Sequence, residues 1–406
     1  MSSLEAAWQK FVELAGEEER ELARFPGRYP HYSNDGQWHR VPIDETSGWV
    51  DESFYDHGNW TAGFSVGHAW LRRLDGGLES APSPVMQSAL GDISKRATDR
   101  TTHDLGFLFY PSFALGQVLG VLSSEEAAPA LTAARVLASR FNHAGQFIQA
   151  FGPRTDPRSA GTSTIDTMMN LPLLWWASKQ DEDESILNIA RSHAATSAKH
   201  FFREDGSTFH LIRFNPKSGD LLEQGTFQGA SASSCWSRGQ AWAIAGFAWA
   251  FGATGDEIFA EAAMRAWEYF EKRVPSTGVV PWDFGDTSSD SVPDASASAI
   301  AALGALLLAA CHPSQKLRED SRAAAEAILA GLDANAVRHD SKNQGILLRS
   351  CYSKPHGLGV RGATPYGDFY YGLALALATG RLKAADLFAT ALPATGMTAS
   401  RTYGQG

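Results

Sequence analysis

Apolar side chains recur along most of this chain at the spacing of one helix face, which predicts an almost entirely helical protein. Segments rich in Gly, Pro, Asp and Ser interrupt the pattern, as expected between helices. The predicted helices span residues 3–24, 62–75, 84–100, 107–122, 124–141, 165–180, 183–202, 235–254, 256–273, 294–311, 315–335, 367–379 and 382–392. Pro172 falls inside one of them, so we expect a kink there.

Two kinds of predicted helix alternate along the chain. Residues 165–177 and 299–311 are apolar on nearly every side, and such helices are buried on every side. Residues 184–200 and 317–332 carry a charged face. The alternation predicts two concentric layers, an all-α (α/α)6 barrel of about twelve helices in six hairpins. No linker or break in composition is visible, so we expect a single domain over residues 1–406.

Short β-hairpins are expected as insertions between the helices. Residues 208–214 alternate between apolar and polar, residues 215–220 supply turn formers, and the strand pattern resumes at Leu221. Residues 278–283 form a weaker extended candidate.

Composition narrows the possible partners. The 406 residues are 44% hydrophobic, enough for a large core. The net charge of −10 disfavours nucleic acid and anionic membranes as partners. An anionic substrate would therefore need positive charge supplied locally.

Cysteine usage and the chain start favour a cytoplasmic location. Cys235, Cys311 and Cys351 are too few for a disulfide framework and fit a reducing compartment. The first residues lack the basic start and apolar run of a signal peptide, and the longest apolar stretches are too short to span a bilayer.

Two aspartates lie in apolar and aromatic surroundings, where a charge is costly unless it is paired or hydrogen-bonded. Asp104 precedes an apolar helix, so an N-cap role fits it as well as a catalytic one. Asp166 lies four residues before Asn170, on the same face of a predicted helix, which indicates a polar pocket. Such placements are typical of carboxyl groups that exchange protons in catalysis.

A Trp-rich stretch after these aspartates has the residue types of a sugar site. His210 lies in a predicted strand, where a structural role is the commoner one, and the aromatic residues could form a packed stripe. Arg238 within that stripe needs an anionic partner, either a structural carboxylate or a substrate carboxylate. Aromatic faces beside polar donors bind sugar rings. The candidates are His210, Gln228, Trp236, Arg238 and Trp242.

Metal and cofactor motifs are absent from the sequence. The histidines and cysteines show no metal-binding spacing, so we predict no metal and no cofactor. Four aspartates crowd one loop, but the EF-hand pattern is missing, and a solvated loop is the interpretation. They are Asp283, Asp286, Asp290 and Asp294.

Together these motifs resemble glycoside hydrolase family 88, the unsaturated glucuronyl hydrolases. The likeness runs from Trp60 to Phe369. Its strongest blocks are His103-Asp104-Leu105-Gly106-Phe107, Ile165-Asp166-Thr167-Met168-Met169-Asn170-Leu171 and Trp236-Ser237-Arg238-Gly239-Gln240-Ala241-Trp242. The chain departs from the family at Phe151, where a Trp is expected, and in the loop 352–366.

The resemblance implies an (α/α)6 barrel that needs no cofactor. It also implies that the enzyme removes a terminal 4,5-unsaturated uronic acid from anionic oligosaccharides. It implies that Asp166 is the acid/base and Asp104 its essential partner. It also implies a sugar site, with the loop 352–366 touching the next sugar. The residues implied for the substrate site are Trp60, His103, His210, Gln228, Trp236, Arg238, Trp242, Arg361 and Tyr366.

Three other functions remain open from sequence. The barrel could hydrolyse saturated glucuronides or galacturonides, or it could isomerise a sugar, because fold alone does not decide function. An isomerase would more naturally use paired histidines, whereas this chain offers paired aspartates. A non-catalytic sugar-binding protein would not need two carboxylates in apolar surroundings.

Overall fold

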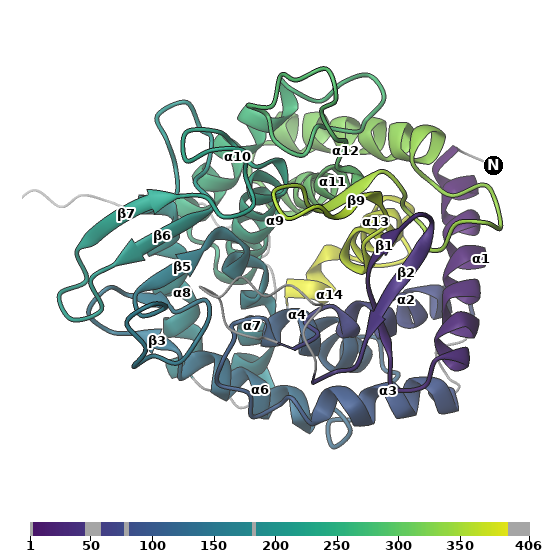
Figure 1. Ribbon diagram of the computed structural model, residues 1–406, viewed down its shortest axis with the longest axis horizontal. Coiled ribbons are helices and arrows are strands. Elements are labelled where there is room, and N and C mark those ends of the chain that lie inside the picture. The colour runs from purple at the N-terminus through teal and green to yellow at the C-terminus, as the bar shows by residue number, and fades with distance from the viewer. Residues whose placement is uncertain (1–2, 45–57, 77–80, 181–183, 389–406) are drawn as a thin grey trace, which may run out of the picture.

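The helices form two concentric rings, as Figure 1 shows. The computed structural model describes residues 3–44, 58–76, 81–180 and 184–388. Within these residues a closed inner ring forms, in which each helix packs against the next. In order, the inner helices are α2 (Ala62–Arg72), α4 (Leu105–Phe109), α7 (Leu171–Gln180), α9 (Ser237–Thr254), α11 (Ala295–Cys311) and α13 (Pro365–Ala378).

The outer ring covers the inner one, because each outer helix packs against at least one inner helix. The outer helices are α1 (Ser3–Arg24), α3 (Pro84–Ser94), α6 (Ala128–Ala138), α8 (Glu184–His200), α10 (Glu257–Glu271) and α12 (Gln315–Asn335). The inner helix α11 is buried from Ala295 to Ala309, whereas α12 buries only one apolar stripe. The predicted all-α barrel is therefore confirmed.

Two predicted helices are interrupted. The segment predicted as 107–122 contains α4, a π-helical turn η2 (Tyr110–Ala114) and α5 (Leu115–Val118). The segment predicted as 165–180 begins with a 3₁₀ turn, η3 (Ile165–Met169), and α7 starts only at Leu171. Pro172 therefore lies in a first helical turn, where its missing N–H costs nothing. Two short pieces complete the set, η1 (Arg73–Asp75) and α14 (Ala384–Phe388), and residues 389–392 of the last predicted helix lie outside the described part.

Short antiparallel strands complete the fold within the described residues. Three hairpins pair β1 (Tyr29–Asn34) with β2 (Gln37–Val41), β3 (Phe141–Asn142) with β4 (Phe147–Ile148), and β8 (Ser350–Ser353) with β9 (Leu358–Gly362). A three-stranded sheet has β6 (Leu211–Phe214) in the middle, paired on one side with β5 (Thr162–Thr164) and on the other with β7 (Leu221–Gly225). The hairpin predicted from residues 208–214, a turn at 215–220 and a strand resuming at Leu221 is confirmed as β6–β7. The β1–β2 and β8–β9 hairpins were not predicted, and they lie together because β1 contacts β9.

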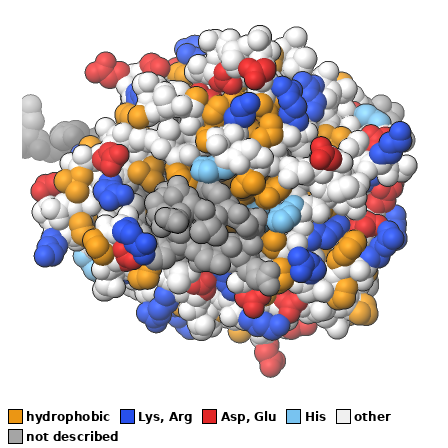
Figure 2. All heavy atoms as spheres, viewed as in Figure 1, with side chains coloured by type: hydrophobic (Ala, Val, Ile, Leu, Met, Phe, Trp, Pro, Cys, Tyr) orange, Lys and Arg blue, Asp and Glu red, His pale blue; other side chains and the backbone are white. Residues whose placement is uncertain are grey.

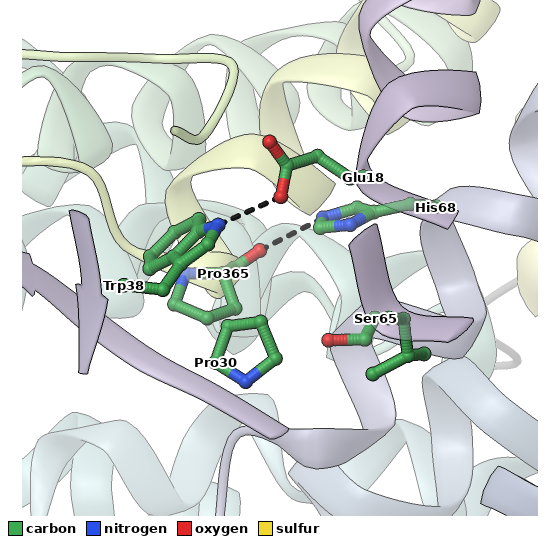
Figure 3. Close-up of a pocket in the computed structure, with 7 residues that line it drawn as sticks. Glu18, Pro30, Trp38, Ser65, His68 and Pro365 are labelled. Atoms are coloured by element: carbon green, nitrogen blue, oxygen red, sulfur yellow. Dashed lines mark hydrogen bonds between the residues drawn. The ribbon is translucent and has the colours of Figure 1, made fainter. Parts of the chain in front are cut away.

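Polar contacts around a small cavity fasten the first hairpin to the outer helix α1 and join the inner helices α2 and α13 (Figure 3). The indole of Trp38 donates a hydrogen bond to the Glu18 carboxylate at 2.7 Å, and His68 bonds the carbonyl of Pro365 at 3.0 Å. Burial raises the pKa of Glu18, although Trp38 and the N–H of Gly345 both donate to it. These contacts join α1, β2, α2 and α13.

The surface seen in Figure 2 carries charged side chains of both signs, interspersed rather than separated. Among the helices of the described residues, none is both long and apolar enough to cross a membrane. All three cysteines are free thiols.

Candidate active site

Asp104 and Asp166 each follow an extended segment, and backbone hydrogen bonds to a third segment between them hold these two segments together. The N–H of His103 donates to the carbonyl of Ala150 at 2.8 Å, and the N–H of Ala150 donates to the carbonyl of Thr162 at 3.0 Å. The segment around Ala150 therefore lies between the segment 101–103 and strand β5.

The two outer segments, 101–103 and β5, each lead to one of the predicted aspartates. Asp104 directly follows the first segment, and Asp166 follows β5 by two residues. Strand β5 pairs with β6 so that Thr164 lies opposite Leu211, and His210 directly precedes that strand. Hydrogen bonding between short strands thus brings together three side chains that are far apart in sequence.

His103 lies between the two carboxyl groups. Its Nε2 atom is 3.3 Å from Asp104 Oδ1 and 3.5 Å from Asp166 Oδ2. Its Nδ1 atom is 2.8 Å from the Thr167 hydroxyl. Burial lowers the pKa of His103 to about 4, so the ring is neutral near pH 7. Because Nε2 faces two carboxyl groups, we assign the ring proton to Nε2, which leaves Nδ1 to accept from the Thr167 hydroxyl.

Asp104 is 9% exposed and is held from its own segment. The Thr102 hydroxyl donates to Asp104 Oδ2 at 3.1 Å. Burial raises the pKa of Asp104 to about 6, against the opposing effects of Thr102 and Arg96. Asp104 stands at the N-cap position of α4, as the sequence allowed, but its side chain makes no capping bond, so the carboxyl group is not used to cap the helix.

Asp166 retains an unused acceptor. Its buried Oδ1 atom has no hydrogen-bond partner among the described residues, and His210 Nε2 lies 3.9 Å away. Burial raises the pKa of Asp166, Asp104 raises it further, and His103 opposes both. A buried carboxyl group of this kind holds its proton more strongly than one in water.

His210 has a defined tautomer. Its Nδ1 atom accepts hydrogen bonds from the backbone N–H groups of Phe227 and Gln228, both at 3.1 Å. Burial lowers the pKa of His210 to about 3, so the ring is neutral. Its proton is therefore on Nε2, the atom that faces Asp166.

Asn170 completes the polar pocket expected from its spacing. Its side-chain carbonyl accepts from the N–H of Phe107 at 2.9 Å, and its amide donates to the backbone carbonyl of Asp166 at 3.4 Å. A Cβ at Gly106 would lie 2.3 Å from Asn170 Cα, so only glycine allows this approach. The two aspartate segments are thereby held against each other.

Aromatic rings form a wall beside these carboxyl groups. Trp60 stacks on Tyr366 with ring centroids 5.2 Å apart. Phe107 lies 5.4 Å from Trp60 and 5.3 Å from Trp242. Trp236 in turn lies 4.5 Å from the His210 ring. Trp60, Trp242 and Tyr366 thus form one cluster with Phe107, and Trp236 is joined to Tyr366 by the Arg238 guanidinium between them.

Tyr352 links three of the predicted residues and was not predicted itself. Its hydroxyl accepts from the Trp60 indole at 3.0 Å. Its backbone carbonyl accepts from Gln228 at 3.1 Å and from Arg238 at 2.6 Å. It lies in the divergent loop, where no helical or strand pattern marked it.

Arg238 is 2% exposed, and its anionic partner is a protein carboxylate. It pairs with Asp294 at 2.7 Å and also donates to the carbonyl of Cys351. Its guanidinium lies over the rings of Trp236 and Tyr366, at 4.5 and 5.1 Å from their centroids. Of the two partners left open by the sequence, the structural carboxylate is present.

The aspartate-rich loop is not uniformly solvated, contrary to the sequence interpretation. Asp283 and Asp294 are fully buried. Asp283 accepts from the N–H of Ala230 at 2.8 Å, and Asp294 caps α11. Because backbone and arginine donors satisfy these carboxylates, they can be buried.

Arg361 makes no hydrogen bond or ion pair with Asp104 or Asp166 among the described residues. It is exposed on β9, and its guanidinium donates to the carbonyls of Asp290 and Ser291. A place for it in the sugar site stays a prediction.

One relative identifies the family. An unsaturated glucuronyl hydrolase of Bacillus sp. (strain GL1) is 35% identical over 372 residues, covering 90% of this chain and 94% of the relative. The chain belongs to the unsaturated glucuronyl hydrolases. An unsaturated chondroitin disaccharide hydrolase of Streptococcus pyogenes serotype M1 is 33% identical over 323 residues, covering 78% of this chain and 80% of the relative. The search against protein-family models found no match.

Solved structures of unsaturated glucuronyl hydrolases share the fold. The crystal structure of the Bacillus sp. GL1 enzyme superposes with a TM-score of 0.82 at 32% identity, covering 91% of this chain and 96% of that one. A Streptococcus agalactiae Asp-to-Asn variant in complex with dGlcA-GalNAc6S superposes with a TM-score of 0.74 at 25% identity, covering 91% and 90%. The resemblance seen in the sequence is confirmed, and this unsaturated glucuronyl hydrolase is a glycoside hydrolase.

The aspartate pair also supplies the one group of three potential metal ligands among the described residues. Single atoms of His103, Asp104 and Asp166 lie within 4.8 Å of one another. We interpret the group as a proton-transfer cluster, because the protonated Nε2 of His103 is directed at both carboxyl groups. The absence of a metal requirement stays a prediction.

Proposed function

We propose that this enzyme removes a terminal 4,5-unsaturated uronic acid from lyase-generated anionic oligosaccharides. The relatives named for unsaturated glucuronyl and chondroitin substrates support this substrate class. They favour hydrolysis of an unsaturated sugar over the saturated-glucuronide and isomerase alternatives.

Asp166 is the proposed acid. Its proton is added to C4 of the C4–C5 double bond, and positive charge develops at C5 and the ring oxygen. The resulting carboxylate takes a proton from a water molecule, whose oxygen bonds to C5. The hemiketal opens by cleaving the bond between C5 and the ring oxygen, and C1 is left as a hemiacetal that releases the neighbouring sugar. This is hydration, so the carboxylate-separation rule for ordinary glycosidases does not apply.

Asp104 and His103 are the proposed partners of that acid. An ionised Asp104 accepts from His103 and stabilises the positive charge that develops on the sugar. The single observation that carries this assignment is the buried Oδ1 of Asp166, which has no donor among the described residues and an elevated pKa. Such a group can hold a proton at rest and release it to the substrate.

The sugar wall is proposed from the aromatic cluster and its polar neighbours. We propose that Trp60, Trp242 and Tyr366 contact the unsaturated ring, while His210 donates from Nε2. Because Asp294 balances the charge of Arg238, we propose that Arg238 acts mainly by holding Tyr352 and the ring of Trp236. Gln228 and Arg361 complete the substrate residues we propose.

The first test is Asp166→Asn, assayed by loss of the enol-ether ultraviolet absorbance of unsaturated disaccharides. Asparagine keeps the shape but has no acidic proton, so kcat should fall by at least ~10²-fold. Asp220→Asn is the control, because this exposed turn residue lies on the β6–β7 hairpin away from the cluster. Near-normal turnover by Asp166→Asn would exclude Asp166 as the acid.

Two broader proposals concern the whole chain. We propose a single catalytic domain, supported by one buried apolar cluster that runs from Ala7 to Phe388. We propose a cytoplasmic location, supported by three cysteines that remain free thiols.

A further inference from the structure

A buried cation lies behind the aspartate pair. Arg140 follows α6 and is 1% exposed. Its hydrogen bonds go to backbone carbonyls, from Nε to Gln149 at 2.9 Å, from Nη2 to Gly152 at 3.1 Å, and from Nη1 to Arg100. None of the described carboxylates forms an ion pair with it at 4.0 Å or less. A buried charge without a partner is costly, so its presence needs a reason.

The three carbonyls belong to the segments that carry the site. Arg100 precedes the segment 101–103, which leads to Asp104. The N–H of Gly152 donates to the carbonyl of Thr101 at 2.7 Å, beside the bond between His103 and Ala150. Arg140 therefore clamps the pairing that places Asp104 beside the segment leading to Asp166.

Two carboxylates, Asp99 and then Asp104, act electrostatically on Arg140. Arg96 donates to Asp99 from Nε at 2.9 Å and from Nη2 at 2.5 Å, so Asp99 already has a cationic partner. Asp104 is the second of the two and has no arginine bonded to it among the described residues. Asp166 is linked to Asp104 through His103, whose Nε2 atom lies near both carboxyl groups.

We propose that Arg140 is a positioning residue that clamps the segment before Asp104 and, through its unpaired charge, keeps Asp104 ionised while Asp166 holds the proton. The proposal rests on the acid and partner roles assigned above. In a coupled pair with one proton, a fixed charge on one side decides which group holds it.

The electrostatic influences on these groups agree in direction. Burial is the largest influence on the pKa of Asp104 and raises it, while Thr102, Arg96, Asn170 and then Arg140 lower it. Burial lowers the pKa of Arg140 to about 10, and the charges of Asp99 and Asp104 oppose that effect. For Asp166 the leading electrostatic influences are His103 and Asp104. The charged and titratable groups facing this cluster are Arg96, Asp99, His103, Asp104, Arg140, Arg154, Asp166, His193 and His210.

Two substitutions separate the charge of Arg140 from its clamp. Arg140→Gln keeps a donor but removes the charge, and Arg140→Lys keeps the charge with a different donor geometry. The pH dependence of kcat/KM is measured by enol-ether absorbance. We call the fall of kcat/KM at low pH the acid limb of the profile. In Arg140→Gln we expect the midpoint of this limb to lie about half a pH unit higher, because the pKa of Asp104 rises. The limb of Arg140→Lys should stay in place even if kcat falls.

Arg338→Gln is the matched control. Arg338 is also a buried guanidinium that clamps a loop, donating to the carbonyls of Gly345 at 2.7 Å and Asp340 at 3.0 Å. It has its own ion pair with Glu17 at 2.6 Å. This variant should lose stability without moving the acid limb. Equal limb positions in Arg140→Gln and the wild type, with a uniform loss of kcat, would reduce Arg140 to a clamp and overturn the charge assignment.

Thermal unfolding tests the same coupling without activity. Arg140→Gln should cost less stability in an Asp104→Asn background than in the wild type, because no carboxylate is then left without its counter-charge. In an Asp166→Asn background the cost should equal that in the wild type. If Arg140→Gln does not fold alone, Asp104→Asn should rescue folding, and failure to rescue would overturn the proposal.

The activity and stability measurements together distinguish a failure of the proposed function from a failure of the role proposed for Arg140. A full stability coupling with no activity on unsaturated disaccharides would contradict the proposed function and leave the link between Arg140 and Asp104 intact. Normal catalysis that depends on Asp166, with no coupling and no limb shift, would contradict only the role of Arg140.

Discussion

At the scale of single residues, the proposed chemistry depends on two carboxyl groups that both lie beside one imidazole. Asp104 and Asp166 both lie within 3.5 Å of His103 Nε2. Burial raises the pKa of each, and each charge opposes ionisation of the other. We therefore expect the pair to titrate as a unit that holds one proton in the proposed active form.

The pH profile should show this shared proton. Because the pKa of Asp104 is about 6, kcat/KM should fall as pH decreases through that value and Asp104 gains a proton. Thr102→Val removes the hydroxyl donor to Asp104 and should move this limb to higher pH. The measurement is kcat/KM on an unsaturated disaccharide from about pH 4.5 to about pH 8.5. A profile that is flat below neutrality in both proteins would contradict the assignment.

Arg238 should matter for stability as well as activity. Arg238→Met leaves Asp294 buried without its partner, which should cost about 3–5 kcal/mol in urea unfolding. Arg191→Met is the comparison, because the side chains of its ion pair with Asp256 are 42% and 33% exposed, so the pair is screened by water and should be worth about 1 kcal/mol or less. Equal losses in the two variants would mean that Arg238 and Asp294 are not a tightly coupled buried pair.

At the scale of elements, close approach through glycine sets the distance between the aspartates. Gly106 in α4 meets Asn170 at the end of η3, where a side chain would collide with backbone. The hydrogen bond from Phe107 to Asn170 forms at the same contact. The inner-ring packing thus fixes the pair of segments on which the chemistry depends.

Gly106→Ala should separate these segments. We expect a loss of about 1–3 kcal/mol in stability from overpacking, together with a lower kcat because Asp104 moves relative to Asp166. Gly91→Ala is the control, because nothing lies within 4 Å of a Cβ at this exposed position of α3. That change should be neutral or slightly stabilising, since alanine favours helices. Unfolding curves and kcat measure both effects.

At the scale of the whole molecule, buried neutral histidines should make the fold sensitive to acid. Burial lowers the pKa of His31, His193 and His210 to about 3, and of His68 and His103 to about 4. The unfolded chain binds protons at these sites near pH 6.5, while the folded chain does not. Their contribution therefore favours unfolding as pH falls from about 6.5 towards 3–4.

His193 is the site at which to test this linkage, because it lies on α8 outside the substrate residues. Its Nδ1 accepts from the N–H of Ile148 at 3.0 Å, a bond that an asparagine carbonyl can replace. His193→Asn should weaken the fall in melting temperature between about pH 6.5 and about pH 4, by the linkage of one proton. His143→Asn, at an exposed position, should leave that slope unchanged. An unchanged slope in His193→Asn would contradict the prediction.

The sequence predicted most of the architecture, because helix formation and burial follow local periodicity. The charged faces of outer helices and the apolar inner helices, such as α12 and α11, are visible as patterns in the chain. The hairpin β6–β7 was predicted for the same reason. The hairpins β1–β2 and β8–β9 were not, since their short strands carry no clear alternation and are stabilised by contacts far along the chain.

By itself, the sequence determined the barrel, the two candidate carboxyl groups and the aromatic composition of the site, because each is encoded in local spacing or residue type. Only the tertiary structure decided that the Asp104 side chain does not cap its helix and that Arg238 pairs with Asp294. Only the structure placed Tyr352 at the junction of Trp60, Gln228 and Arg238, three residues distant in sequence. Long-range hydrogen bonds and buried charge depend on which segments meet, and that is determined by packing rather than by local pattern.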